Sequence, residues 1–465
     1  MSRIQETAYQ GIKLIQDEAN ALIALEQQLE KSIPKVTEIN WETFGFTTEN
    51  KRITGLGLCN QGLETFPEVL LNLTNLEWLI LCDNQLTSLP ETFGNLSPLK
   101  ELFLYRNRLQ VLPENFGDLK KLEILWLYNN QLKALPESFG NLINLKKLWL
   151  NNNQLKSLPE SFTNLRKLKK LWLNQNKLIS LPELFGQLTD LQSLFLGDNQ
   201  LVSLPGSFSN LRYLEELYLG RNQLISLPEN FGKLEILKEL SLYKNQLQTL
   251  PRSFFELSNL RTLNLGSNRL RKLPESFGKL RKLRKLDLER NQLSNLPESF
   301  GKLGSIQVLR LQVNKLKTLP ESIGKLVNLQ TLRIWHNQLQ TLPENIGQLK
   351  SLTELNLSYN KLDTLPKSFG RLKNLKELDL SNNKLNCLPE TIGNLTNLQN
   401  LNLGWNQLQT LPESIGNLTH LRTLNLWNNQ LQMLPDSFKN LRNLKTFHLG
   451  NKSLSNSLEE RKKIK

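Results

Sequence analysis

The chain has 465 residues, of which 39% are hydrophobic and 22% charged, and its formal net charge is +15. No segment approaches the roughly 20 consecutive apolar residues that span a bilayer, which argues against a membrane protein. The first residues carry scattered charges and no apolar core, unlike a secretory signal, and three cysteines are too few for a disulfide framework. We therefore expect a cytoplasmic protein.

The N-terminal segment, residues 1–50, is expected to be a helical cap. Apolar residues recur at helical spacing from Ile4 to Ile33, and Pro34 follows the last of them. This spacing predicts an amphipathic helix that ends before the proline. A stack of repeats needs such a cap, because its terminal coil would otherwise expose its core to solvent.

A 23-residue repeat occupies the rest of the chain. From Pro67 to Pro435 a proline recurs every 23 residues, seventeen times in all, within the frame L-x-x-L-x-L-x-x-N-x-L-x-x-L-P-x-x-F-G-x-L-x-x. A period of about 20–29 residues with this leucine and asparagine pattern is the signature of a leucine-rich-repeat solenoid. We predict an α/β solenoid of about 18 coils over residues 51–454, followed by a polar basic tail over residues 455–465.

One coil, residues 122–144, gives the expected path of the chain. Leucines at every second position, Leu125 and Leu127, give this segment a period of two, so we predict a short strand with both leucines inward and Trp126 outward. Strands of successive coils then pair in parallel. Asparagine recurs at the position of Asn130 in the other coils, and its side chain is expected to form hydrogen bonds with backbone groups of neighbouring coils. Because the return path is bulkier than a strand, the strands should line the concave side.

The outward position of the strand carries aromatic residues in six consecutive coils. These rings, with tyrosines and lysines beside them, form the main candidate for a partner-binding surface: Phe103, Tyr105, Trp126, Tyr128, Lys147, Trp149, Lys170, Trp172, Phe195, Tyr218 and Tyr243. Exposed apolar stripes of this size are rare without a use, and tryptophan and tyrosine dominate binding hot spots. A structural interpretation stays open, because aromatic residues also favour strands and contact one another on neighbouring strands.

A sparser set of candidates lies in the C-terminal half. Four aromatic residues are expected at the edge of the strands there, beside two arginines that make the middle of the face charged: Trp335, Tyr359, Trp405 and Trp427, with Arg310 and Arg333. We include them in the predicted partner-binding surface.

Two cysteines occupy the same position in neighbouring coils. Cys59 and Cys82 should lie on adjacent strands about 5 Å apart, a separation compatible with a disulfide. Reduced thiols are the favoured interpretation for a cytosolic protein, and the alternative stays open.

Two basic runs, Arg166–Lys170 and Arg261–Lys285, raise the question of nucleic-acid binding. The residue after the repeat proline is acidic in fourteen of seventeen coils, and the one aromatic residue within the second run, Phe277, is the phenylalanine of the repeat frame. Nucleic acid is therefore the less favoured partner, because single-strand binding usually combines basic and aromatic side chains.

The frame L-P-E-S-F-G-N-L-x-x-L-x-x-L-x-L-x-x-N-Q-L resembles intracellular leucine-rich-repeat proteins of the Ras-group and Ras-pathway-scaffold type, over about residues 53–454. Long cytoplasmic repeat proteins of bacteria and archaea carry the same frame. The resemblance implies a right-handed solenoid with short helical turns outside. It also implies protein partners on the concave side, such as a small GTPase or a kinase-pathway component in intracellular signalling.

No catalytic motif is apparent. The chain has no phosphate-binding G-x-x-x-x-G-K-[ST] loop, no H-E-x-x-H and no C-x-x-C, and its three histidines lie in separate coils. We predict a non-catalytic interaction scaffold without cofactor or metal. The alternative is a glycan or cell-surface receptor that uses the rings as stacking platforms.

Overall fold

A computed structural model of the protein describes residues 5–450. The chain falls into two compact units, Met1–Leu237 and Lys238–Lys465. Each unit is a stretch of right-handed leucine-rich-repeat solenoid, as predicted, with one short strand per coil. The expected tail, residues 455–465, lies outside the described residues.

The strands of each unit form an open parallel ladder in chain order. Unit 1 contains β4 (Arg52–Leu58), β5 (Trp78–Ile80), β6 (Glu101–Phe103), β7 (Ile124–Trp126), β8 (Lys147–Trp149), β9 (Lys170–Trp172), β10 (Ser193–Phe195) and β11 (Glu216–Tyr218). Unit 2 contains β12 (Glu239–Ser241), β13 (Thr262–Asn264), β14 (Lys285–Asp287), β15 (Val308–Arg310), β16 (Thr331–Arg333), β17 (Glu354–Asn356), β18 (Glu377–Asp379), β19 (Asn400–Asn402), β20 (Thr423–Asn425) and β21 (Thr446–His448). These eighteen strands match the predicted number of coils.

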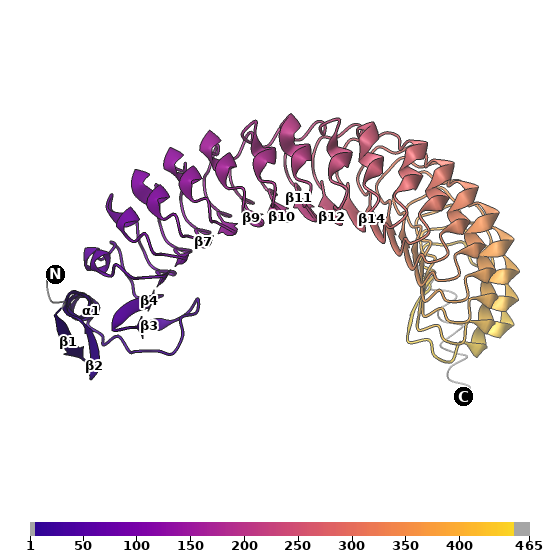
Figure 1. The fold of residues 1–465 in the computed structure, drawn as a ribbon. Coiled ribbons are helices and arrows are strands. Elements are labelled where there is room, and N and C mark those ends of the chain that lie inside the picture. The colour runs from indigo at the N-terminus through magenta and orange to yellow at the C-terminus, as the bar shows by residue number, and fades with distance from the viewer. Residues whose placement is uncertain (1–4, 451–465) are drawn as a thin grey trace. The chain divides into compact units, whose positions relative to one another are not determined.

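Each return path between successive strands from β4 to β21 contains a short 3-10 helix. In unit 1 these are η1 (Glu68–Asn72), η2 (Phe93–Asn95), η3 (Glu114–Asp118), η4 (Glu137–Asn141), η5 (Glu160–Asn164), η6 (Phe185–Gln187), η7 (Gly206–Asn210) and η8 (Phe231–Lys233). In unit 2 they are η9 (Arg252–Glu256), η10 (Glu275–Lys279), η11 (Glu298–Lys302), η12 (Glu321–Lys325), η13 (Glu344–Gln348), η14 (Lys367–Arg371), η15 (Glu390–Asn394), η16 (Glu413–Asn417) and η17 (Asp436–Asn440). Within each unit the strands lie on the inner side of the curve and these helices on the outer side (Figure 1).

The core repeats with the sequence. Leu125, Leu127 and Phe139 are fully buried, and the ring of Phe139 lies parallel to Phe116 and Phe162 of the neighbouring coils, with centroids 6.1 and 6.0 Å away. Each coil therefore buries its apolar side chains against the coils on either side, which is why a single coil would not fold alone.

The predicted asparagine ladder is confirmed. The side-chain oxygen of Asn130 accepts a hydrogen bond from the Leu109 amide at 3.0 Å, and its amide group donates to the carbonyls of Leu104 at 2.9 Å and Leu127 at 3.1 Å. One buried side chain thus satisfies backbone groups of two coils, at a point where no strand pairing reaches them.

The N-terminal cap differs from the prediction. Residues expected to start a long helix form an antiparallel hairpin of β1 (Glu6–Tyr9) and β2 (Ile12–Ile15), and the helix α1 covers only Gln16–Leu29. Gln10 and Gly11 both have positive φ angles, 48° and 79°, which is the backbone of a tight hairpin turn. The predicted helix over Ile4–Ile33 is therefore wrong at both ends.

The cap also covers the first edge of the sheet. β3 (Phe44–Glu49) pairs antiparallel with β4. The buried carboxylate of Glu18 in α1 accepts hydrogen bonds from the Ile53 amide at 2.6 Å and from Arg52 at 3.2 Å. These contacts bind the cap to the solenoid and leave the edge of β4 paired rather than open to another chain.

Candidate protein-interaction surface

The inner face of unit 1 carries a ladder of aromatic rings. We call Trp126, Trp149, Trp172, Phe195 and Tyr218 the aromatic ladder; each is half-buried and projects from the last residue of strands β7 to β11. The strand pairing places each ring directly beside the next. The prediction that these side chains point outward while the flanking leucines point inward is confirmed.

Four of the five rings are parallel to one another. The centroids of Trp149 and Trp172 are 4.3 Å apart, those of Trp172 and Phe195 4.9 Å, and those of Phe195 and Tyr218 4.7 Å, with planes inclined by no more than 8°. These spacings equal the distance between neighbouring strands, about 4.8 Å. Each ring therefore covers the face of its neighbour and leaves its edge on the open side of the inner face.

Trp126 ends the ladder differently. Its ring is inclined by 59° to that of Trp149, at 5.1 Å, and meets Phe103 at 85°, at 4.8 Å. Its indole Nε1–H is buried and has no acceptor among the described residues.

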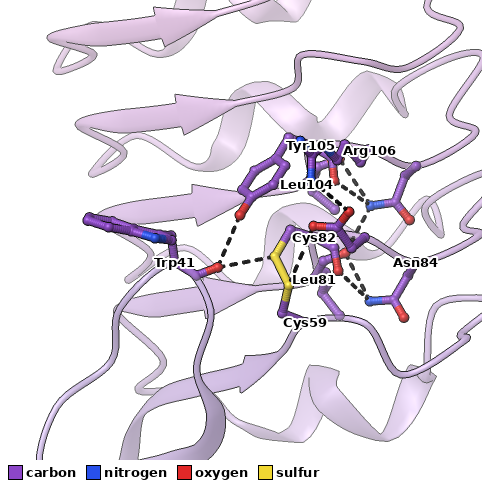
Figure 2. Close-up of polar contacts among 10 residues, drawn as sticks. Trp41, Cys59, Leu81, Cys82, Asn84, Leu104, Tyr105 and Arg106 are labelled. Atoms are coloured by element: carbon purple, nitrogen blue, oxygen red, sulfur yellow. Dashed lines mark hydrogen bonds and ion pairs between the residues drawn. A yellow bond between two sulfur atoms is a disulfide. The ribbon is translucent and has the colours of Figure 1, made fainter.

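Phe103 and Tyr105 do not belong to the exposed stripe, contrary to the prediction. They are only 7% and 5% exposed and form a buried cluster with Ile80 and Cys82. The loop between α1 and β3 covers them: Ile39 packs against the cluster, and the Trp41 carbonyl accepts a hydrogen bond from Tyr105 Oη at 3.1 Å (Figure 2). Burial raises the pKa of Tyr105 to about 12.

The sequence contained a signal for this covering loop. Gly55 and Gly57 occupy the inner face of β4, and a Cβ atom on Gly57 would lie 2.2 Å from the Thr43 carbonyl oxygen. Glycine within a strand often marks the close approach of another backbone. The two glycines therefore identify the first coil as the one whose inner face is occupied.

The two cysteines are bonded to each other. A disulfide joins Cys59 to Cys82, whose Cα atoms are 4.7 Å apart, so the favoured interpretation of two reduced thiols is wrong. The Cys82 sulfur also lies 3.2 Å from the Trp41 carbonyl oxygen, and Asp83 pairs with Arg106 at 3.3 Å beside it (Figure 2). The two sulfurs and the Asp83 carboxylate lie within 4.8 Å of one another, but sulfurs bonded to each other are not thiolate ligands for a metal.

Lysines border the aromatic ladder on one side. Lys147 and Lys170 begin β8 and β9 and are exposed, and the exposed Lys169 directly precedes Lys170. Lys146 pairs with Glu123 at 2.6 Å, whereas no ion pair is found for Lys147, Lys169 or Lys170 among the described residues.

Tyrosines mark the two ends of the predicted surface. Tyr128 is half-buried and stacks on Tyr105, with ring centroids 4.6 Å apart. Tyr243 is half-buried in unit 2. Of these two tyrosines, Tyr128 therefore belongs to the same unit as the aromatic ladder and Tyr243 does not.

The predicted aromatic residues of unit 2 form two separate groups. Trp405 and Trp427 meet at a 76° angle with centroids 4.5 Å apart, and Tyr359 lies parallel to His336 at 6.2 Å, with Trp335 beside the same histidine. Tyr359 and Trp405 have positive φ angles and exposed side chains. Among its described residues, unit 2 therefore has small aromatic groups and no continuous ladder on its inner face.

The two arginines predicted to be on the binding surface, Arg310 and Arg333, form ion pairs with acidic residues of unit 2 itself. Arg310 bonds Asp287 at 3.4 Å, and Arg333 bonds Glu354 at 2.7 Å. Burial raises the pKa of Asp287. Sequence reasoning did not identify the groove beyond them, of about 370 Å³, which is lined mostly by polar side chains, among them Asn356, Asp379, Asn402, Asn425 and His448.

Family models match most of the chain. The model described as a leucine-rich repeat region matches residues 255–337, 302–407 and 391–463. The model described as a leucine rich repeat matches 74–132, 181–224 and 228–270, and a two-copy repeat model matches 143–186. The chain belongs to the leucine-rich repeat proteins.

Solved structures support this assignment. A leucine-rich repeat protein of Leptospira interrogans, LIC12759, is 38% identical over 84% of this chain and 94% of its own, with a TM-score of 0.71. The plant peptide hormone receptor RGFR1 in complex with RGF2 is 30% identical over 88% and 76%, with a TM-score of 0.66. PEPR1-AtPEP1 is 26% identical over 93% and 75%, with a TM-score of 0.68. A comparison with curated proteins found no match.

Leucine-rich repeat proteins are in general protein-interaction scaffolds, and this one has the corresponding extended inner face in each unit. The narrower resemblance to the Ras-group type remains a prediction. Over residues 5–450, no helix has the length and apolar character needed to cross a membrane.

Proposed function

We propose that this leucine-rich repeat protein is a non-catalytic scaffold that binds a protein or peptide partner on the aromatic ladder of unit 1. The observation that carries the proposal is the row of five half-exposed rings on consecutive strands. Large aromatic side chains bring much contact area at a low cost in conformational entropy, which is why they are concentrated in binding hot spots.

The fold itself does not require these rings. The same strand position in unit 2 carries Ser241, Asn264, Asp287 and Arg310 in successive coils, and those strands pair with the same register. Ring-to-ring contact contributes to stability, but it does not explain why an aromatic row is present in one unit and absent from the other. Binding of a partner to the rings of unit 1 would explain this difference between the units.

The orientation of the rings favours protein over glycan. A sugar or a base stacks on the face of an aromatic ring, and the faces of Trp149, Trp172 and Phe195 are covered by their neighbours. Few ring faces in the aromatic ladder are therefore free for a sugar to stack on, which argues against the glycan alternative. RGFR1 in complex with RGF2, a peptide hormone receptor by its description, supports a peptide or protein ligand for this fold.

The kind of partner and the compartment are also proposals. A small GTPase or kinase-pathway component, and a role in cytoplasmic signalling, follow from the resemblance of the repeat frame alone. The bond between Cys59 and Cys82 favours an oxidising compartment instead, because disulfides persist there and are rare in the cytosol. Fractionation of the native cells distinguishes the two.

The test is an affinity capture with matched variants. Wild type is compared with a Trp126→Ala, Trp149→Ala, Trp172→Ala triple variant and with a control that loses three tryptophans from unit 2, Trp335→Ala, Trp405→Ala, Trp427→Ala. We expect the first variant to lose a partner that wild type and the control retain, while circular dichroism shows all three folded. If the first variant stays folded and recovers every partner of wild type, the ladder is not the site.

A further inference from the structure

The margin of the aromatic ladder is positively charged at two lysines, and the charge of Lys147 is only partly offset by Glu101, two strands away. Lys147 and Lys170 are direct partners across β8 and β9, so their Cα atoms lie about 4.8 Å apart. Like charges on neighbouring strands repel one another. Since neither lysine has an ion pair among the described residues, an anionic group from outside the chain would relieve this repulsion.

The ring edges favour the same kind of group. An aromatic ring is negative on its faces and positive around its edge. Because Trp149, Trp172 and Phe195 leave their edges on the open side of the inner face, they favour carboxylate and carbonyl oxygens, and they favour the faces of partner rings in T-shaped contacts.

Unpaired polar atoms beside the rings point to an extended backbone. The indole N–H of Trp126 is a buried donor without an acceptor, and the side-chain oxygens of Asn151 and Asn174 are buried acceptors without donors, among the described residues. A peptide in an extended conformation has both free N–H and free C=O groups, whereas a helix has used most of its own. Small side-chain movements that open these atoms would allow such a chain to pair with them.

The ladder also has a definite length. Centroid separations of 5.1, 4.3, 4.9 and 4.7 Å carry it over about 19 Å from Trp126 to Tyr218. An extended chain rises about 3.3 Å per residue, so about six residues cover this distance.

We propose that the occupant of the aromatic ladder is an extended acidic peptide segment of about six residues, with Asp or Glu side chains toward Lys147 and Lys170 and apolar side chains on the ring edges. This inference rests on the proposed function and specifies its partner. The margin changes from Lys147 and Lys170 through Ser193 to Glu216 along the paired strands. The acidic part of the segment therefore lies over Trp149 and Trp172, and the end near Tyr218 is neutral or basic.

A random heptapeptide phage library is the probe. It is selected on immobilised full-length protein, and an enriched peptide is then labelled and titrated by fluorescence polarisation. We expect enriched sequences with acidic and apolar residues together. Affinity should fall by about tenfold or more, equivalent to about 1.4 kcal/mol, for Lys147→Glu, Lys170→Glu. It should also weaken as salt is added, because the lysines are exposed.

The control carries the same charge change elsewhere in unit 1. Lys120→Glu, Lys121→Glu reverses two exposed lysines before β7 and should bind as wild type does. Enrichment of neutral or basic peptides, absence of enrichment, or equal affinity of the Lys147/Lys170 variant overturns the acidic segment. If the affinity capture still depends on the tryptophans in that case, the proposed function stands without this inference; if that dependence fails as well, both fall.

Discussion

Trp149 and Trp172 lie face to face, with ring centroids 4.3 Å apart and planes inclined by 8°. The register of β8 and β9 sets this contact, because the two residues are direct partners in the sheet. The same register repeats through Phe195 and Tyr218. A surface that is aromatic in composition therefore presents ring edges, and its ligand chemistry differs from what the residue types alone suggest.

Removing the disulfide should destabilise the N-terminal end of unit 1. Cys59 and Cys82 close a loop with a sequence separation of 23 residues, and such a cross-link contributes about 3 kcal/mol, depending on the model used for the unfolded chain. We expect reductant to lower the melting temperature and to increase proteolysis in the loop that contains Trp41.

The experiment is cleanest in a Cys387→Ser background, since Cys387 is exposed and free. That protein should contain no reactive thiol after denaturation without reductant, and two after reduction. Two reactive thiols in the untreated protein, with unchanged melting on reduction, would mean that the pair is not bonded in solution.

An asparagine of the ladder should matter far more than an exposed one. Asn130→Ala leaves the Leu109 amide without its partner and removes one of the two asparagine hydrogen bonds at the carbonyls of Leu104 and Leu127, which keep those from Asn107 and Asn153. One buried amide left unpaired costs about 1–3 kcal/mol, and with the two lost hydrogen bonds a total loss of about 2–4 kcal/mol is expected.

Hydrogen exchange at the Leu109 amide measures this loss locally, which suits a repeat protein that does not unfold as one unit. Asn141→Ala, on the exposed end of η4, is the control and should leave exchange unchanged. Equal protection of Leu109 in the Asn130 variant and wild type would contradict the structural role.

Much of the fold was predictable because the repeat determines which positions face inward. Trp126 between two buried leucines and Asn130 in the turn were placed correctly from their spacing alone. Phe103 and Tyr105 were not, because the segment that covers them comes from outside the repeat and obeys no period. The hairpin before α1 was missed for a related reason: the same apolar residues fit helical spacing, and only the turn at Gln10 and Gly11 distinguishes the two structures.

Alkaline pH should release the covering loop. The pKa of Tyr105 is raised to about 12 by burial, whereas in an unfolded chain a tyrosine titrates near 10. Between about pH 10 and 12 the folded protein keeps a proton that the unfolded chain loses, so stability is full below this window and falls as the pH rises through it.

Absorbance of the phenolate follows this titration, and Tyr105→Phe should remove the step that accompanies loosening of the loop. The variant also loses the hydrogen bond to the Trp41 carbonyl, so its stability at neutral pH should fall by about 1 kcal/mol. Tyr213→Phe, at an exposed position, should change neither property. An identical alkaline profile in the Tyr105 variant would mean that another group controls the transition.

A substitution of Gly57 tests whether the covering loop can pack against β4 only when the residue beneath it has no side chain. A Cβ atom at this position would lie 2.2 Å from the Thr43 carbonyl oxygen and 2.8 Å from its carbon, both of them backbone atoms that cannot rotate away. Gly57→Ala should therefore push the loop off β4, cost about 1–3 kcal/mol, and expose Phe103 and Tyr105. Iodide quenching of Trp41 and Trp126 and binding of a hydrophobic dye report the opening.

Gly206→Ala, where a Cβ atom meets nothing within 4 Å, is the matched control. A Gly57→Ala protein with wild-type stability and no dye binding would show that the loop accommodates the methyl group, and that the glycine is not what allows its close approach.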